Sequence, residues 1–138
     1  AVFYRTTTKS HTQDAEFDID SVHTLPRVDI AYAYAGADGL LVRALVEAGV
    51  AGIVAGGLGS GGSPSKMMAA LKTATQSGIP VVIATQTGNG RVVRTRRYDE
   101  DGYIVADNLS PKKTRILLML ALTKTKDPEE IQRMMLTY

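Results

Sequence analysis

The sequence lacks cysteine and tryptophan altogether. Without cysteine the chain has no disulfide, no thiolate metal ligand and no cysteine nucleophile. It also lacks a long apolar run, because the longest one, Ile116 to Leu122, is far shorter than the ~20 residues that a membrane-spanning helix needs. These absences exclude a disulfide scaffold and cysteine chemistry, and we expect no membrane partner.

The sequence also lacks a large excess of one charge, since it has 16 Lys and Arg and 14 Asp and Glu, for a net charge of +2. A balance this small gives no reason to expect a nucleic-acid partner. The chain is 44% apolar and 22% charged over 138 residues, which is ordinary for one globular domain with its own core. Lack of cysteine is compatible with both cytoplasmic and periplasmic or secreted proteins, so the compartment stays open.

Acidic residues are missing from one long internal stretch, between Glu47 and Asp99. This stretch contains Gly57-Leu58-Gly59-Ser60-Gly61-Gly62, which fits G-x-G-x-x-G between an apolar run and an expected helix start. A dinucleotide site also needs an acid about 20 residues further on to hold the ribose, where this chain has Thr85-Gln86-Thr87. Two other interpretations therefore compete with a nucleotide site. One is a tightly turned connection, and the other is a loop whose glycines let a small anion or a neighbouring chain approach.

Apolar runs alternate with amphipathic segments from residue 26 onward. Strands are expected at Val28–Tyr34, Ala51–Ala55, Pro80–Thr85 and Tyr103–Val105, helices after Asp38, Ser63, Ser110 and Asp127, and an irregular segment at Gln86–Gly102. Buried strands that alternate with helices predict an α/β fold, a small Rossmann-like parallel sheet with helices on both faces. Ligands of such sheets bind beyond the carboxyl ends of the strands.

Residues 1–25 show no such alternation. Residues 1–5 are expected to form an edge strand, and Thr6 to Leu25 is a polar connection, long for a compact domain. It is either a linker from a preceding domain or a functional loop, and we favour the linker. His11 and His23 lie in this connection at a spacing that fits no metal template, so we expect neither a metal site nor a cofactor.

Two further clusters of side chains are candidate sites. Arginines at 91, 94, 96 and 97 stand directly before Asp99-Glu100-Asp101, which favours a solvated loop with internal ion pairs. Ser63 is expected to cap the following helix, because neither histidine is placed to act as its base. No nucleophile–base pair can be assembled, and we expect no catalytic residue in this chain.

Several separate motifs, in order, resemble the C-terminal domain of bacterial L-asparaginases and glutaminase-asparaginases. They are Phe17–Asp20, Leu25–Ala35, Gly52–Val54 with Gly57–Gly61, Thr87–Gly90, Leu109–Thr123, Asp127-Pro128, Ile131-Gln132 and Tyr138. The resemblance covers essentially all 138 residues. It implies that residues 1–25 are the end of a preceding domain with the interdomain connection, and that residues 26–138 are the C-terminal domain.

The family resemblance implies an amidohydrolase that converts L-asparagine, and in some members L-glutamine, to the acid and ammonia. A threonine is the nucleophile in that family, in T-G-G-T and G-T-D-T motifs of the N-terminal domain. Neither motif occurs here, and Thr6-Thr7-Thr8 does not match them. We therefore expect this chain to be about the C-terminal two-fifths of such an enzyme, and to be inactive alone.

The resemblance also implies a homo-oligomer, a dimer of intimate dimers, in which this domain lends substrate contacts to a partner's active site. One contact aligns with Gly62 or, after a one-residue shift, with Ser63; if Gly62 is the equivalent, the side-chain contact is missing. The other is a carboxylate, Glu100 with Asp99 next, that would pair with the α-ammonium of the substrate. The alternative is a stand-alone α/β module that binds a phosphate or nucleotide at Gly57–Gly62.

Overall fold

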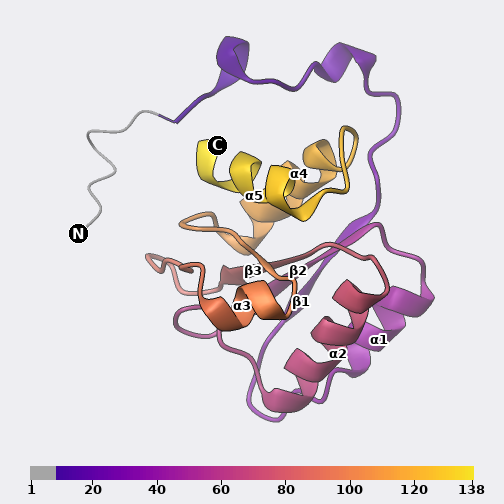
Figure 1. Ribbon diagram of the computed structural model, residues 1–138, viewed down its shortest axis with the longest axis vertical. Helices are drawn as coiled ribbons and strands as arrows, with labels where there is room; N and C mark the ends of the chain where they lie inside the picture. Colours follow the sequence, from indigo (N-terminus) through magenta and orange to yellow (C-terminus); the bar gives the residue numbers. More distant parts are fainter. Residues whose placement is uncertain (1–8) are drawn as a thin grey trace.

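The computed structural model describes residues 9–138, so the edge strand expected at residues 1–5 lies outside the described range. Within that range, four strands form one parallel sheet in the order β1-β2-β3-β4. They are β1 (Val28–Tyr32), β2 (Gly52–Gly57), β3 (Val81–Thr85) and β4 (Ile104–Val105). Figure 1 shows this sheet between two groups of helices, which confirms the predicted α/β class.

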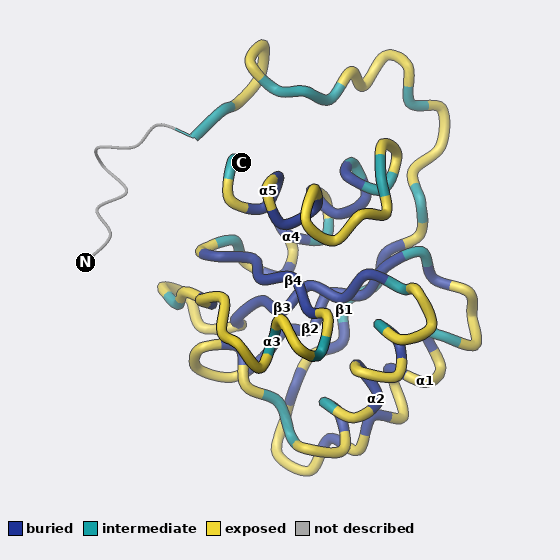
Figure 2. Tube along the Cα trace, viewed as in Figure 1, coloured by how far each residue is buried: buried dark blue, intermediate teal, exposed yellow. Residues whose placement is uncertain are grey.

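Helices cover both faces of the sheet. They are α1 (Leu40–Glu47) and α2 (Ser65–Gln76), which pack on one face, and α4 (Pro111–Ala121) and α5 (Pro128–Thr137), which pack on the other. In β2, Ile53 and Ala55 join the α1–α2 side of the core whereas Val54 joins the α4–α5 side, as the strand pleat requires. Burial on both faces explains why β2 and β3 are apolar throughout, and both are dark blue in Figure 2.

Helix starts follow their capping residues in most cases. Thr95 caps α3 (Arg96–Glu100), Ser110 caps α4, and Asp127 accepts from the Glu129 amide at 3.2 Å at the start of α5. At α1 the N-cap is Gly39, and Asp38, one residue before it, accepts from the Leu40 amide at 2.9 Å. The expected cap at Ser63 is wrong, because α2 begins later, with Pro64 at the N-cap and no side-chain cap bond. Among residues 9–138 no helix is long and apolar enough to cross a bilayer.

The segment expected to be irregular contains a short helix, α3 (Arg96–Glu100). Thr95 starts it by accepting a hydrogen bond from the Tyr98 amide at 3.3 Å. The Tyr98 ring meets Tyr103 edge-on at 5.9 Å, and the Tyr103 hydroxyl donates to the Met68 carbonyl of α2 at 2.9 Å. Tertiary contacts to buried Tyr103 therefore hold α3, which has too few residues to show a helical period.

β4 lies at one end of the sheet and receives a side chain in place of a further strand. The amide group of Gln132, on α5, accepts from the Val105 backbone N–H at 2.9 Å and donates to the Val105 carbonyl at 3.1 Å. Gln132 is only 4% exposed, so these bonds are made in the dry interior. The side-chain amide satisfies both backbone groups that the edge of β4 would leave unpaired.

Candidate functional site at the carboxyl edge of the sheet

The loops that follow β1, β2 and β3 meet at the carboxyl edge of the sheet. The Ala33 amide donates to the Gly56 carbonyl at 2.8 Å, and the Gln86 amide donates to the Gly57 carbonyl at 3.0 Å. The side chain of Gln86 then reaches back to the Ala33 carbonyl at 2.8 Å. The three loops are thus fastened to one another, at the edge where parallel sheets bind ligands.

The glycine loop after β2 closes on itself. Leu58 and Gly62 form an antiparallel bridge, with the Leu58 amide 2.7 Å from the Gly62 carbonyl and the Gly62 amide 2.8 Å from the Leu58 carbonyl. The Gly61 amide donates to the same Leu58 carbonyl at 3.0 Å. A phosphate cradle presents its backbone amides to the ligand, whereas these three amides are used inside the loop.

Close backbone approach explains the glycines of this loop. A Cβ on Gly57 would stand 2.2 Å from the Gly61 carbonyl oxygen, and one on Gly61 would stand 2.7 Å from the Ile83 side chain. Gly59 and Gly61 also have positive φ angles, of 53° and 98°. The loop is the tightly turned connection, and the nucleotide-binding alternative is not supported.

Two threonines, Thr85 at the end of β3 and Thr87 in the loop after it, hold this edge together. The hydroxyl of Thr85, at the end of β3, lies 2.5 Å from the Gly59 carbonyl and 2.8 Å from the Thr87 hydroxyl. Thr85 is 2% exposed and Thr87 is exposed, so the hydroxyl pair joins a buried strand end to the loop surface. Gly90 packs directly over it, because a Cβ there would come within 2.1 Å of the Thr87 hydroxyl.

Asp107, just beyond β4, is a charged residue at this edge that sequence reasoning missed. It is 5% exposed, has a φ of 53°, and pairs with Arg91 and, at 3.9 Å, with Lys9. Its carbonyl accepts from the Val92 amide at 2.9 Å. Arg91 is therefore not part of a purely solvated arginine run. A single acid placed directly after an apolar strand was the signal in the sequence.

The two predicted loop residues differ in what they expose. Gly62 is exposed, and a Cβ there would meet the Leu58 carbonyl oxygen at 3.5 Å, an ordinary contact distance. Ser63 is half-buried, and its hydroxyl is shielded from solvent without a hydrogen-bond partner among the described residues. Of the two, Gly62 is the position that a ligand or another chain can reach.

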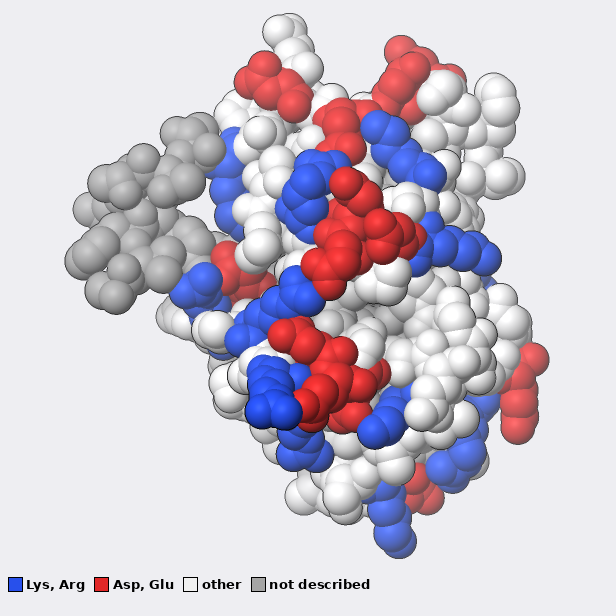
Figure 3. Space-filling view, viewed as in Figure 1, with Lys and Arg blue, Asp and Glu red and all other residues white. Residues whose placement is uncertain are grey.

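The two predicted carboxylates lie on α3. Acidic and basic side chains alternate over the face of the molecule that Figure 3 shows. Glu100 pairs with Arg96 at 2.7 Å and Asp99 with Arg94 at 2.5 Å. Arg94 also binds Glu129 of α5 through two hydrogen bonds, at 3.0 and 2.6 Å. These bonds from Arg94 hold the pKa of Glu129 below its ordinary value. The prediction of ion pairs inside this segment is confirmed for Arg94 and Arg96.

The predicted loop residues, Gly62 and Ser63, lie far from the predicted carboxylates, Asp99 and Glu100. Asp101 stands next to Glu100. Its backbone carbonyl accepts a hydrogen bond from the Thr75 hydroxyl at 2.9 Å, and its carboxylate pairs with Lys72 at 2.6 Å, near the end of α2. Gly62 lies before the start of α2. A helix rises 1.5 Å per residue, so the ten steps from Ser65 to Thr75 span ~15 Å. The glycine loop and the acidic pair therefore lie toward opposite ends of α2.

A parallel sheet between two helical layers, with a carboxyl edge built from interlocked loops, defines a three-layer α/β domain. Within residues 9–138 no group of three or more His, Asp or Glu side chains could hold a metal ion. Residues 27–135 match the sequence model of the Glutaminase/Asparaginase C-terminal domain. The chain belongs to this family.

Known proteins similar to this chain are longer than it is. Glutaminase-asparaginase of Pseudomonas fluorescens biotype A is 40% identical over 99% of this chain and 38% of the relative. L-asparaginase 2 of Escherichia coli (strain K12) is 38% identical over 99% of this chain and 40% of the relative. The crystal structure of probable cytoplasmic L-asparaginase from Campylobacter jejuni superposes with a TM-score of 0.91, at 40% identity, over 99% of this chain and 44% of that one. The chain thus spans about two-fifths of the length of these proteins.

Proposed function

We propose that this chain acts as the C-terminal domain of an asparaginase-type amidohydrolase whose intact form hydrolyses L-asparagine, and L-glutamine as a second substrate, to the acid and ammonia. The similarity to proteins named for these activities, over 99% of the chain, is the observation that carries the proposal. On this proposal residues 1–25 are the end of a preceding domain with its connection, and residues 26–138 the C-terminal domain. The parallel strands with helices on both faces support a Rossmann-like description of the latter.

On this proposal the chain contributes contacts and an interface, and the threonine nucleophile belongs to the N-terminal domain that this chain lacks. The intact protein is a homotetramer, a dimer of intimate dimers, in which this domain faces the active site of a partner subunit. The exposed glycine loop at the carboxyl edge and the exposed carboxylates of α3 are the groups available for that role.

Glu100 is the stronger of the two carboxylate candidates. Its side chain is 60% exposed and pairs with Arg96, which is itself 93% exposed. Asp99 shares Arg94 with Glu129, so removing it from that network would disturb the link between α3 and α5. An exposed ion pair contributes little free energy, and a substrate ammonium group can therefore replace Arg96 beside Glu100 at small cost.

At the loop, Gly62 is the stronger candidate, and its contact would come from its carbonyl oxygen, which has a second lone pair beside the one that accepts from the Leu58 amide. The shielded hydroxyl of Ser63 would have to leave its present position to touch a ligand. Gly62 has no side chain to offer, but it stands at the open side of the loop. Because the glycine loop and the acidic pair lie toward opposite ends of α2, Gly62 and Glu100 are alternative positions for the amino group of the substrate, and we favour the carboxylate of Glu100.

A domain exchange tests the proposal. L-asparaginase 2 of Escherichia coli would be shortened by the part that matches this chain, and the 138 residues would be joined in its place. We expect the chimera to release ammonia from L-asparagine, while the shortened protein and the isolated chain release none. A folded, oligomeric chimera without hydrolysis would contradict the proposed role, and ammonia release by the isolated chain would show that it carries a nucleophile of its own.

A further inference from the structure

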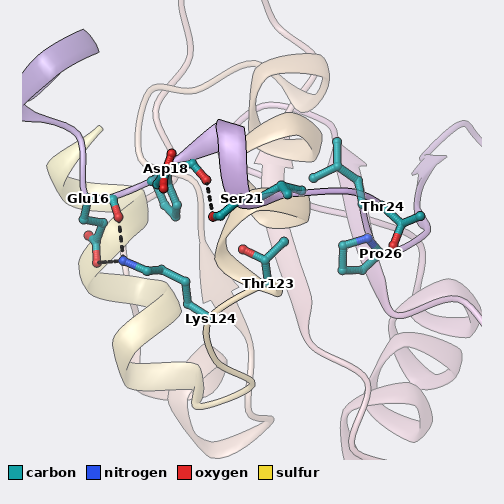
Figure 4. Close-up of a pocket in the computed structure, with 10 residues that line it drawn as sticks. Glu16, Asp18, Ser21, Thr24, Pro26, Thr123 and Lys124 are labelled. Atoms are coloured by element: carbon teal, nitrogen blue, oxygen red, sulfur yellow. Dashed lines mark hydrogen bonds and ion pairs between the residues drawn. The ribbon is translucent and has the colours of Figure 1, made fainter.

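The connection between residues 9 and 26 passes over the α4–α5 layer with open space beneath part of it. A hollow of about 670 Å³ separates this connection from the end of α4 (Figure 4). Its lining residues include Glu16, Asp18, Ser21, Thr24, Thr123 and Lys124. Residues 18–21 and 23–25 are exposed, so little apolar packing holds this part of the connection. The connection must therefore be held by contacts of a few particular residues.

Glu16 is the main point of attachment. Arg133 of α5 donates to both carboxylate oxygens of Glu16, at 2.8 and 2.9 Å. Lys124 donates to the Glu16 carbonyl at 2.6 Å and lies 3.7 Å from the carboxylate. The Tyr138 hydroxyl accepts from the Glu16 amide at 2.8 Å and donates to its carboxylate at 3.2 Å. Every polar group of Glu16 is thus bound by residues more than 100 positions away in the sequence.

Neighbouring contacts extend the attachment on both sides of Glu16. The Phe17 ring lies 5.2 Å from the Tyr138 ring, and the Lys124 ammonium lies 5.7 Å from the Phe17 ring centre. The Ser10 amide donates to the Thr137 carbonyl at 3.2 Å, which satisfies one of the carbonyls that the end of α5 leaves free. The last two residues of the sequence therefore bind the connection at two places.

We propose that Glu16 and Tyr138 form a clasp that holds the connection on the α4–α5 layer and so fixes the direction in which the chain before residue 15 leaves the domain. Arg133 and Lys124 supply its positive charge, and Glu130 shares Arg133 at 2.8 Å without touching the connection. The clasp is a positioning device: it sets where a segment upstream of the domain would stand relative to the carboxyl edge. The proposed clasp consists of residues of this chain alone and does not depend on any hydrolytic activity.

Hydrogen exchange in the 138-residue chain tests the clasp. Backbone exchange of residues 11–26 would be compared with that of β2 and β3 in the wild type, Glu16→Ala, Tyr138→Phe and the double variant. Glu130→Gln is the matched control, because it removes a carboxylate from the same arginine. Loss of a charged hydrogen bond at the attachment should speed exchange in the connection about tenfold, with β2 and β3 unchanged.

The double variant distinguishes a clasp from independent contacts. Because the Tyr138 hydroxyl binds the Glu16 carboxylate, the effects of the two substitutions should be non-additive. Tyr138→Phe should speed exchange less in the Glu16→Ala variant than in the wild type, because only the bond from the amide of residue 16 is then left to lose. Unchanged exchange in residues 11–26, an equal change in Glu130→Gln, or faster exchange in β2 and β3 as well would each overturn the proposal. Tyr138→Phe keeps the ring on Phe17, so it gives an independent reading if Glu16→Ala fails to fold.

Discussion

Gly57 and Gly61 face each other across the glycine loop so closely that a Cβ on Gly57 would lie 2.2 Å from the Gly61 carbonyl oxygen. The contact is between backbone groups, which cannot move aside as the end of a flexible side chain can. At Gly62, by contrast, the nearest atom to an added Cβ is the Leu58 carbonyl oxygen at 3.5 Å. Two glycines of one motif therefore have different reasons to be present.

Gly57→Ala should destabilise the fold and Gly62→Ala should not. Forcing a methyl group into the Gly57–Gly61 contact displaces a packed backbone, and we expect a loss of about 3 kcal/mol in the free energy of unfolding. Gly62→Ala adds a methyl group on the open side of the loop, and we expect a change within about 0.5 kcal/mol. Urea unfolding of both variants measures the difference, and equal losses would show that the loop is not closed as described.

The letters G-x-G-x-x-G could not reveal this distinction in advance. The pattern correctly predicted a strand, a turn and a helix start, because β2 is apolar and α2 is amphipathic. The Leu58–Gly62 bridge depends on how Gly61 packs under Ile83 and Val92, which are 20 or more residues away. Ser63 followed by Pro64 resembles a capping residue before a proline at the first helical position, but α2 begins one residue later, so the predicted cap at Ser63 is wrong.

Gln132→Leu should weaken the fold through β4. The substitution keeps the bulk of the side chain but leaves the Val105 N–H and C=O without partners in the interior. Each unsatisfied buried group costs roughly 1–3 kcal/mol, so we expect a loss of about 3 kcal/mol in the free energy of unfolding. Gln76→Leu, at an exposed position on α2, is the control and should stay within about 0.5 kcal/mol. A similar result for both variants in thermal or urea unfolding would refute the role of Gln132.

The burial of Gln132 could not be predicted from the sequence. The resemblance marked it as part of a motif, but a polar residue in an amphipathic helix normally faces water. It points inward because β4 is a strand of two residues at the edge of the sheet, a fact that only the strand order supplies. α3 was missed for a related reason, since Thr95 and the Tyr98–Tyr103 contact define it, and the latter is a tertiary contact.

Acid should release the clasp through Glu16. The hydrogen bonds from Arg133 are the largest cause that holds the pKa of the Glu16 carboxyl below its ordinary value near 4.5. A carboxyl with a depressed pKa in the folded state contributes stability above pH 4.5 and loses it as the pH falls through the lowered pKa. The wild type should therefore be more stable than Glu16→Gln at pH 7, and the difference should shrink steadily below pH 4.5.

Unfolding free energies of both proteins between pH 3 and pH 7 measure this effect. Glu47→Gln, which removes an exposed carboxylate from α1, is the control. The difference in unfolding free energy between the wild type and Glu47→Gln should change less with pH than the difference between the wild type and Glu16→Gln. A gap between wild type and Glu16→Gln that stays constant down to pH 3 would mean that the carboxylate charge is not what holds the connection.

The choice between Glu100 and Asp99 can be made by kinetics in the chimera that carries this domain. If Glu100 binds the α-ammonium of the substrate, Glu100→Gln removes a charge-assisted hydrogen bond and should raise KM for L-asparagine at least about tenfold. Asp99→Asn should change KM less, because Asp99 is held by Arg94 at 2.5 Å. The reverse order of effects would assign the contact to Asp99.

Arg96→Gln gives the sharpest check on the same assignment. Arg96 pairs with the Glu100 carboxylate at 2.7 Å and so competes with any ammonium group for it. Removing this competitor should leave KM unchanged or lower it, opposite in direction to Glu100→Gln. If Arg96→Gln instead raises KM as much as Glu100→Gln does, the ion pair acts by holding the shape of α3, and the substrate ammonium group binds elsewhere.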